Sequence, residues 1–167
     1  VDYVLQRRFS ASGYLAGVTF PDGEAVGTPG QPILYDGAGR VSLVPGFVTS
    51  VEYDALGRPN VRVNGNGTTT TWNYDLLRGW LTHLQTTGAG EGEGIQALDY
   101  TVNAIGQVTQ VTSPFPDESW SYEYDELGRL TQATNLYAPF ESQGFQYDAV
   151  GNKTYDSRLG AITYPPA

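Results

Sequence analysis

One short motif, Tyr-Asp-x-x-Gly-Arg, recurs along this chain of 167 residues and limits its fold more than any other feature. Successive Asp places lie 18, 21, 28, 22 and 23 residues apart, which is the range of periods at which repeat proteins are built. An active site occurs once in a domain, whereas this motif recurs. The motif residues, which we predict to be structural repeat turns, are Tyr35, Asp36, Gly39, Arg40, Tyr53, Asp54, Gly57, Arg58, Tyr74, Asp75, Gly79, Asn103, Gly106, Tyr124, Asp125, Gly128, Arg129, Tyr147, Asp148 and Gly151.

Each copy of the motif is predicted to be the turn of a β-hairpin. Ahead of one copy, Trp120, Tyr122 and Tyr124 alternate with polar residues, as in a strand with one apolar face. The Asp that follows can accept hydrogen bonds from the backbone N–H groups just beyond it. The Gly three places later can adopt the positive φ that reverses the chain. The motif therefore predicts a strand, a tight turn and a returning strand.

The predicted fold class is all-β, because no long segment has the 3.6-residue period of a helix. Consecutive hairpins most simply pair as an antiparallel meander of about a dozen strands. We expect a single array over residues 1–167, with a degenerate first copy near residues 9–15. The Gly-rich tract at 87–94 is predicted to be a flexible insertion. The repeat turns are expected near residues 36–40, 54–58, 75–79, 103–107, 125–129 and 148–152.

The composition excludes several classes of function. A net charge of −9 argues against binding to nucleic acid or to an anionic membrane surface. The chain has no Cys, and hence no disulfide, thiolate nucleophile or Cys-based metal site. No stretch approaches the roughly 18 apolar residues of a membrane span. The sequence does not begin with Met, so we expect a processed product or a piece of a longer chain, and the composition favours an extracellular location.

Residues that could carry chemistry have simpler structural interpretations. The recurring Asp and Arg residues invite comparison with the paired carboxylates of glycosidases, but their identical context favours turn acceptors. His83 lies in a strand-like segment without a nucleophile motif, which favours a plain strand histidine over a general base. Glu91 and Glu93 could touch calcium, yet no calcium-loop pattern surrounds them. We therefore predict no catalytic, metal or cofactor site.

Aromatic residues leave one alternative open. Trp72 and Trp120 could stack on a glycan, which would make the chain a cell-surface adhesin or carbohydrate-binding module. We expect instead that the aromatic rings line the inner face and form the core of the sheet, since aromatic burial is the largest apolar contribution available. Asn66 and Asn152 each start a glycosylation acceptor pattern, although Asn66 also suits a hairpin turn.

The array of "YDGAGRV", "YDALGRP", "YDELGRL" and "YDAVGNK", with partial copies between, resembles the YD-repeat or Rhs-repeat family. This family includes the shells of Rhs polymorphic toxins, the cocoon of insecticidal toxin complexes, wall-associated proteins and the teneurins. The resemblance extends from about Phe9 to Tyr164. It implies hairpins laid side by side in a curved, spiralling antiparallel sheet, as an open strip or as part of a shell.

The resemblance also implies a non-enzymatic structural role, as a scaffold within a secreted shell that encloses a toxin cargo. The expected partners are the rest of a longer repeat chain, or further copies that add edge to edge into a polymer or filament. Some members release their cargo with an aspartate self-cleavage module containing Asp-Pro dipeptides. This sequence has no Asp-Pro dipeptide, so no protease residues are carried over.

Overall fold

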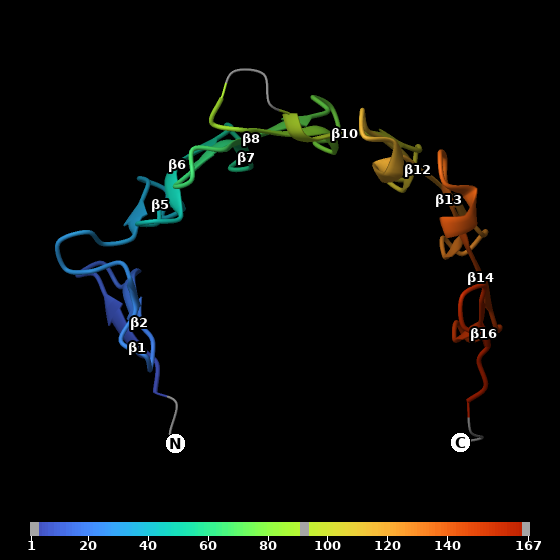
Figure 1. Ribbon diagram of the computed structural model, residues 1–167, viewed down its shortest axis with the longest axis horizontal. Helices are drawn as coiled ribbons and strands as arrows, with labels where there is room; N and C mark the ends of the chain where they lie inside the picture. Colours follow the sequence, from blue (N-terminus) through green and yellow to red (C-terminus); the bar gives the residue numbers. More distant parts are fainter. Residues whose placement is uncertain (1–3, 91–93, 165–167) are drawn as a thin grey trace. The chain divides into compact units, whose positions relative to one another are not determined.

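The computed structural model describes residues 4–90 and 94–164, and these are almost entirely β (Figure 1). The predicted fold class is confirmed, because each strand pairs antiparallel with a neighbour in sequence. The strands are β1 Gln6–Phe9, β2 Leu15–Thr19, β3 Ala25–Val26, β4 Leu34–Tyr35, β5 Val41–Leu43, β6 Val48–Tyr53, β7 Pro59–Asn64, β8 Thr69–Tyr74, β9 Leu81–Thr87, β10 Gly94–Val102, β11 Val108–Thr112, β12 Trp120–Tyr124, β13 Leu130–Asn135, β14 Gln143–Tyr147, β15 Lys153–Asp156 and β16 Gly160–Ala161, with the short 3₁₀ helices η1 Pro116–Glu118 and η2 Pro139–Glu141.

The chain divides into two compact units. Unit 1 comprises Val1–Trp72 and Gln85–Ile95, and unit 2 comprises Asn73–Leu84 and Gln96–Ala167. In unit 1, β1, β2 and β3 form a three-stranded sheet, and β4 pairs with β5. The hairpin of β6 and β7 follows, and β7 pairs in turn with β8.

Unit 2 is a continuous meander in which β10 to β16 are hydrogen-bonded in chain order. Tyr100 lies opposite Val111, which lies opposite Trp120. Because side chains alternate along a strand, Trp120, Tyr122 and Tyr124 share one face of β12. Ser121 and Glu123 point to the other face, so this sheet has an aromatic face and a polar face.

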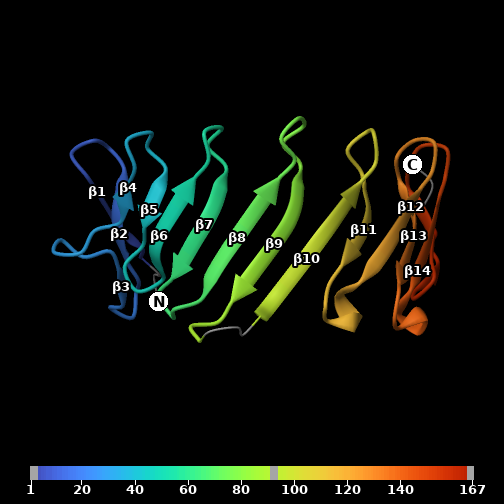
Figure 2. The ribbon, with the colours of Figure 1, turned by 90° about the horizontal axis from the view of Figure 1, so that it is seen from above.

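Strand direction places the repeat turns of unit 2 along one edge. Since neighbouring strands run in opposite directions, the turns at 75–79, 103–107, 125–129 and 148–152 all lie at the same end of their strands. We call this the turn edge (Figure 2). The connections at 113–119, 135–142 and 157–159 lie at the opposite end, which we call the loop edge.

The prediction that the aromatic rings form the core of the sheet is wrong. Among the described residues, the buried hydrophobic side chains are those of three alanines, Ala16, Ala133 and Ala138, and the rings of Trp72 and Trp120 are only half-buried. The physical reason is that contacts between elements link strands to their sequence neighbours. Rings on one sheet shield each other laterally, and a second layer is needed for full burial.

The ends of the tract at 87–94 belong to strands. Thr87 is the last residue of β9, and Gly94 is the first residue of β10. Glu91 and Glu93 lie outside the described residues, and so does the calcium contact suggested for them. The predicted flexibility of the tract concerns these residues too and stays a prediction. In the part of the chain that the structure describes, no helix is long and apolar enough to cross a membrane.

Candidate functional site: the repeat turns and their lateral contacts

Within its own turn, the motif Asp organises the backbone through one carboxylate oxygen. Asp36 Oδ1 accepts hydrogen bonds from the N–H groups of Ala38 and Arg40, each at 2.9 Å. The Asp36 N–H donates to the carbonyl of Arg40 at 2.8 Å, and Gly39 N–H donates to the carbonyl of Asp36 at 3.0 Å. Gly39 has a φ of 78°, so the turn is a three-residue hairpin loop closed by a left-handed glycine.

The second carboxylate oxygen holds the Arg four places on. Arg40 Nε donates to Asp36 Oδ2 at 2.7 Å. The same contact recurs at 2.7 Å between Arg58 and Asp54 and between Arg129 and Asp125. Charge-assisted bonds of this length fix the direction of the guanidinium. Each Asp therefore closes its own turn and also aims the Arg side chain.

The motif Tyr joins its hairpin to the preceding one. Its hydroxyl donates to the backbone carbonyl of the residue that follows the Arg place of the previous turn. Tyr53 bonds to Val41 at 2.7 Å, and Tyr147 bonds to Leu130 at 2.9 Å. Further bonds of this kind run from Tyr35 to Leu15, from Tyr124 to Val108 and from Tyr164 to Lys153.

The motif Arg joins its hairpin to the following one. The Arg40 guanidinium lies 4.3 Å from the ring centroid of Tyr53, and that of Arg129 lies 4.8 Å from the ring of Tyr147. Arg129 Nη1 also donates to the carbonyl of Asp148, at 2.9 Å. A cation over an aromatic face is attracted by the ring electrons. Arg, Tyr and backbone carbonyl thus form one lateral clamp between successive hairpins.

The weaker copies of the motif form the same kind of turn, but other side chains make the contact with the next hairpin. Asn103 accepts from the N–H of Ile105 and Gln107 as an Asp would. The Gln107 side chain reaches the next turn by donating to the carbonyl of Gly128 at 3.2 Å. In the first turn Ser10 takes the Asp place, accepting from the N–H of Tyr14, and Gly13 has a φ of 81°. Side chains that accept backbone N–H bonds are therefore interchangeable here.

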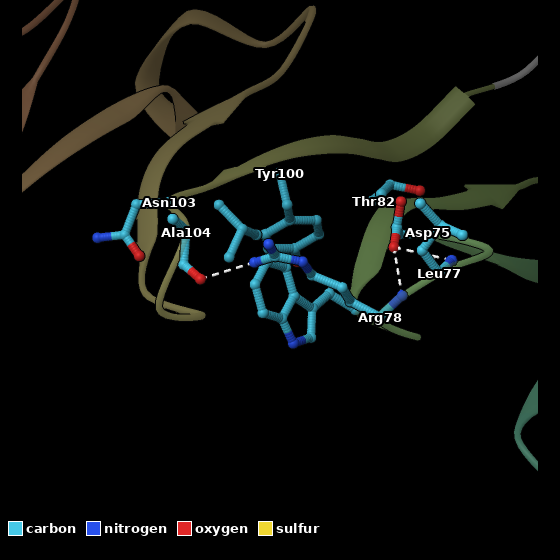
Figure 3. A pocket seen from close by; sticks show the side chains of 9 residues that line it. Asp75, Leu77, Arg78, Thr82, Tyr100, Asn103 and Ala104 are labelled. Carbon is cyan, nitrogen blue, oxygen red and sulfur yellow. Dashed lines mark hydrogen bonds between the residues drawn. The ribbon is translucent and has the colours of Figure 1, made fainter.

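The turn at 75–79 is one residue longer, because Gly79 comes late. Asp75 Oδ1 accepts from the N–H of Leu77 at 3.1 Å and of Arg78 at 2.6 Å. The Arg78 guanidinium lies 4.7 Å from the ring of Trp80, and Nη1 donates to the carbonyl of Ala104 at 2.6 Å (Figure 3). An Arg at a shifted position thus still contacts the following turn.

Two further turns follow the same rule without matching the motif. Asn64 N–H donates to the carbonyl of Thr68, and Gly67 N–H donates to the carbonyl of Asn64. Asp156 Oδ1 accepts from the N–H of Arg158, and its Oδ2 accepts from Lys153 at 2.7 Å. The sequence signal for both is a polar residue, Asn64 or Asp156, followed by Gly three or four places later.

Folding lowers the pKa of four motif carboxyl groups, those of Asp36, Asp54, Asp125 and Asp148. For Asp36, Asp54 and Asp125, the main cause of the lowered pKa is the backbone N–H bond from the Arg four places on. For Asp148 the main cause of the lowered pKa is the side-chain bond from Asn152. Each bond favours the ionised carboxylate.

Acid is therefore expected to destabilise the array. A carboxyl group whose pKa is lower in the folded chain stabilises the fold above its ordinary pKa of 3.8. That contribution is lost as the pH falls through the folded pKa. The urea midpoint should be clearly lower at pH 3 than at pH 6, with a smaller difference in Asp125→Asn. Equal midpoints at the two pH values would contradict this assignment.

The other candidate residues are not gathered at one site. His83 Nδ1 lies 2.7 Å from Asp99 Oδ1 across neighbouring strands. Trp72 is covered by Arg62, whose guanidinium lies 5.4 Å from the ring centroid. Asn66 lies within the turn at 64–68, and the Asn152 amide donates to Asp148. Among the described residues, no group of three His, Asp or Glu side chains comes together as a metal site.

An open groove of about 350 Å³ lies beside the long turn in unit 2. It is lined by Asp75, Arg78, Trp80, Tyr100 and Asn103, among others. Figure 3 shows that the Arg78 side chain reaches across it toward Ala104. The groove combines aromatic surface with hydrogen-bonding groups and is open to solvent.

Comparison with known proteins agrees with this geometry. The RHS Repeat family model matches residues 102–136. A crystal structure of TcdB2-TccC3 is similar over 92% of this chain and 9% of that chain, at 20% identity and a TM-score of 0.76. The Photorhabdus luminescens Tc holotoxin pore is similar over 95% and 9%, at 19% identity and a TM-score of 0.74. The search of curated proteins gave no match.

A row of antiparallel hairpins, joined through one recurring motif, defines a β-repeat protein. The recognition from the sequence is confirmed: residues 102–136 match the RHS Repeat family model, and the chain shares the fold of a segment of TcdB2-TccC3. The chain spans about 9% of the length of the solved chains that it matches.

Proposed function

We propose that this chain is a structural, non-enzymatic unit whose hairpins form part of a shell outside the cell. The observation that carries the proposal is the lateral clamp. Arg129 contacts Asp125 in its own turn, and both the ring of Tyr147 and the carbonyl of Asp148 in the next. The polar groups of the motif bind adjacent hairpins to each other, as expected for a scaffold.

The proposed partners follow from the same contacts. The hairpin at 125–129 receives a contact from the preceding turn and makes one to the following turn, so further hairpins of the same kind are the natural neighbours. We infer that these come from the rest of a longer repeat chain, or from further copies that pair through their edge strands into a polymer or filament. The similarity to TcdB2-TccC3 supports a toxin cargo as the enclosed partner.

A chimera tests this function. The segment of TcdB2-TccC3 that matches this chain would be replaced by residues 4–164. If the chain is a shell unit, the chimera should form particles of the parent's outline and protect its cargo from protease. In a matched chimera carrying Arg40→Met and Arg129→Met, the cargo should be cleaved by the protease. Particles that fail to close, with the isolated chain folded by circular dichroism, would refute the proposal.

The second candidate function is glycan binding at the cell surface. The groove beside the long turn favours it, because aromatic rings next to amide and carboxylate groups suit sugar stacking. Trp80 and Tyr100 line this groove, whereas Trp72 and Trp120 are not among its lining residues. Binding on a glycan array that is lost in Tyr100→Ala, with the fold intact, would support it. Silence across the array would count against it.

A further inference from the structure

The turn edge of unit 2 carries a row of aliphatic side chains exposed to solvent. They occupy the middle of successive repeat turns, which lie side by side at the same end of the strands (Figure 2). Their exposed fractions run from 73% at Leu127 to 97% at Leu76. The residues of this aliphatic row are Leu76, Leu77, Ile105, Leu127 and Val150.

The turn itself does not require these side chains. The hydrogen bonds of an Asp-x-x-Gly turn use the Asp carboxylate and backbone groups, as in the turn at 125–129. The middle positions of such turns usually take small or polar residues. In this array the turn at 36–40 has Gly37 and Ala38 there. An aliphatic residue at the tip of each turn is therefore explained by a contact outside the hairpin.

Charges are placed symmetrically along the aliphatic row. Arg78 is exposed beside Leu77, and Glu126 is exposed beside Leu127. Between them, the turn at 103–107 has no charged residue. Arg78 uses one guanidinium nitrogen on the carbonyl of Ala104, which leaves other donors. The row thus has a cation one hairpin before Ile105 and an anion one hairpin after it.

We propose that a second copy of this chain docks on this turn edge, with a two-fold axis beside Ile105. An antiparallel arrangement brings Arg78 against Glu126 of the second copy and Leu77 against Leu127 of the second copy. The two Ile105 side chains meet at the axis. Such an isologous contact closes on itself and gives a dimer. Apolar tips face apolar tips, and each charge faces its opposite.

Parallel docking of the same two edges is disfavoured. It would place Arg78 against Arg78 of the second copy and Glu126 against Glu126 of the second copy. Stacking of the turn edge on the loop edge would not bring Arg78 against Glu126, because both residues lie on the turn edge. The inference deepens the scaffold role proposed above. Its test uses the isolated chain, so its failure and that of the chimera are separate results.

Charge reversal tests the pairing by sedimentation velocity over a range of concentrations. Arg78→Glu or Glu126→Arg alone should raise the dimer dissociation constant at least tenfold. The double variant restores both pairs across the axis and should return the constant to within about threefold of the parent value. Glu123→Arg, on the polar face of β12, is the matched control and should change nothing. Failure of the double variant to restore association would overturn the proposal.

Cysteine cross-linking tests the axis, because the chain has no Cys of its own. Under mild oxidation Ile105→Cys should form a covalent dimer, and Leu127→Cys alone should not. Mixing Leu77→Cys with Leu127→Cys should cross-link the two variants. Equal cross-linking of Thr101→Cys, which lies within strand β10, or a monomeric parent chain at all concentrations tested, would overturn the proposal.

Discussion

Replacing Asn135 by Ala should produce one of the two largest losses of stability in this chain. Asn135 is fully buried and connects two segments of the loop edge, 113–119 and 135–142. Its Oδ1 accepts from the N–H groups of Tyr137 at 3.0 Å and Ala138 at 2.8 Å, and its Nδ2 donates to the carbonyl of Asp117 at 3.0 Å. Truncation leaves these backbone groups without a partner.

The expected cost is about 3 kcal/mol of unfolding free energy, because each buried polar group left unsatisfied costs about 1–3 kcal/mol. Urea unfolding followed by tryptophan fluorescence would measure it. Gln146→Ala, at an exposed strand position, is the control and should change stability by less than about 0.5 kcal/mol. A similarly small change for Asn135→Ala would mean that the loop edge is held by other contacts.

Replacing Gly39 by Ala is the second large effect. Gly39 has a φ of 78°, a backbone angle that residues other than glycine rarely adopt. A Cβ at this position would collide with the hydroxyl and ring of Tyr14. Tyr14 cannot move freely, since it stacks on Tyr35 with ring centroids 4.7 Å apart. Backbone strain and steric overlap therefore act together.

We expect Gly39→Ala to cost about 2–3 kcal/mol, of which the left-handed backbone contributes roughly 1–2 kcal/mol. Gly37 in the same turn is the matched control. No atom lies within 4 Å of the position that its Cβ would occupy, and its φ is not positive. Gly37→Ala should leave the urea midpoint unchanged or raise it slightly. Equal effects of the two substitutions would show that the lateral packing on Gly39 is unimportant.

Much of the fold follows from the sequence because the turn chemistry is local. An Asp and a Gly three places apart define a loop whose hydrogen bonds lie within five residues, as at Asp54. Local turns in succession produce sequential antiparallel pairing. The long turn at 75–79 keeps the same outcome, because Asp75 still accepts from the two backbone N–H groups before Gly79.

The contacts between hairpins were less accessible to sequence reasoning. Nothing in the motif indicates that the Tyr53 hydroxyl bonds to Val41, twelve residues earlier. Asn135 was missed altogether, because its partners come from separate loops and no sequence pattern marks it. The expected aromatic core also failed for a tertiary reason. Alternation of rings along a strand defines an apolar face, and it does not indicate whether another layer covers that face.

By itself, then, the sequence determined the hairpins, their order and their turns, since these depend on interactions between residues only a few places apart. The tertiary structure alone decided how the motif is used. Arg40, aimed by Asp36, lies on the ring of Tyr53 in the next hairpin, and the Tyr53 hydroxyl bonds back to the hairpin of Arg40. Such contacts depend on the lateral register of strands, which hydrogen bonding between hairpins sets in space.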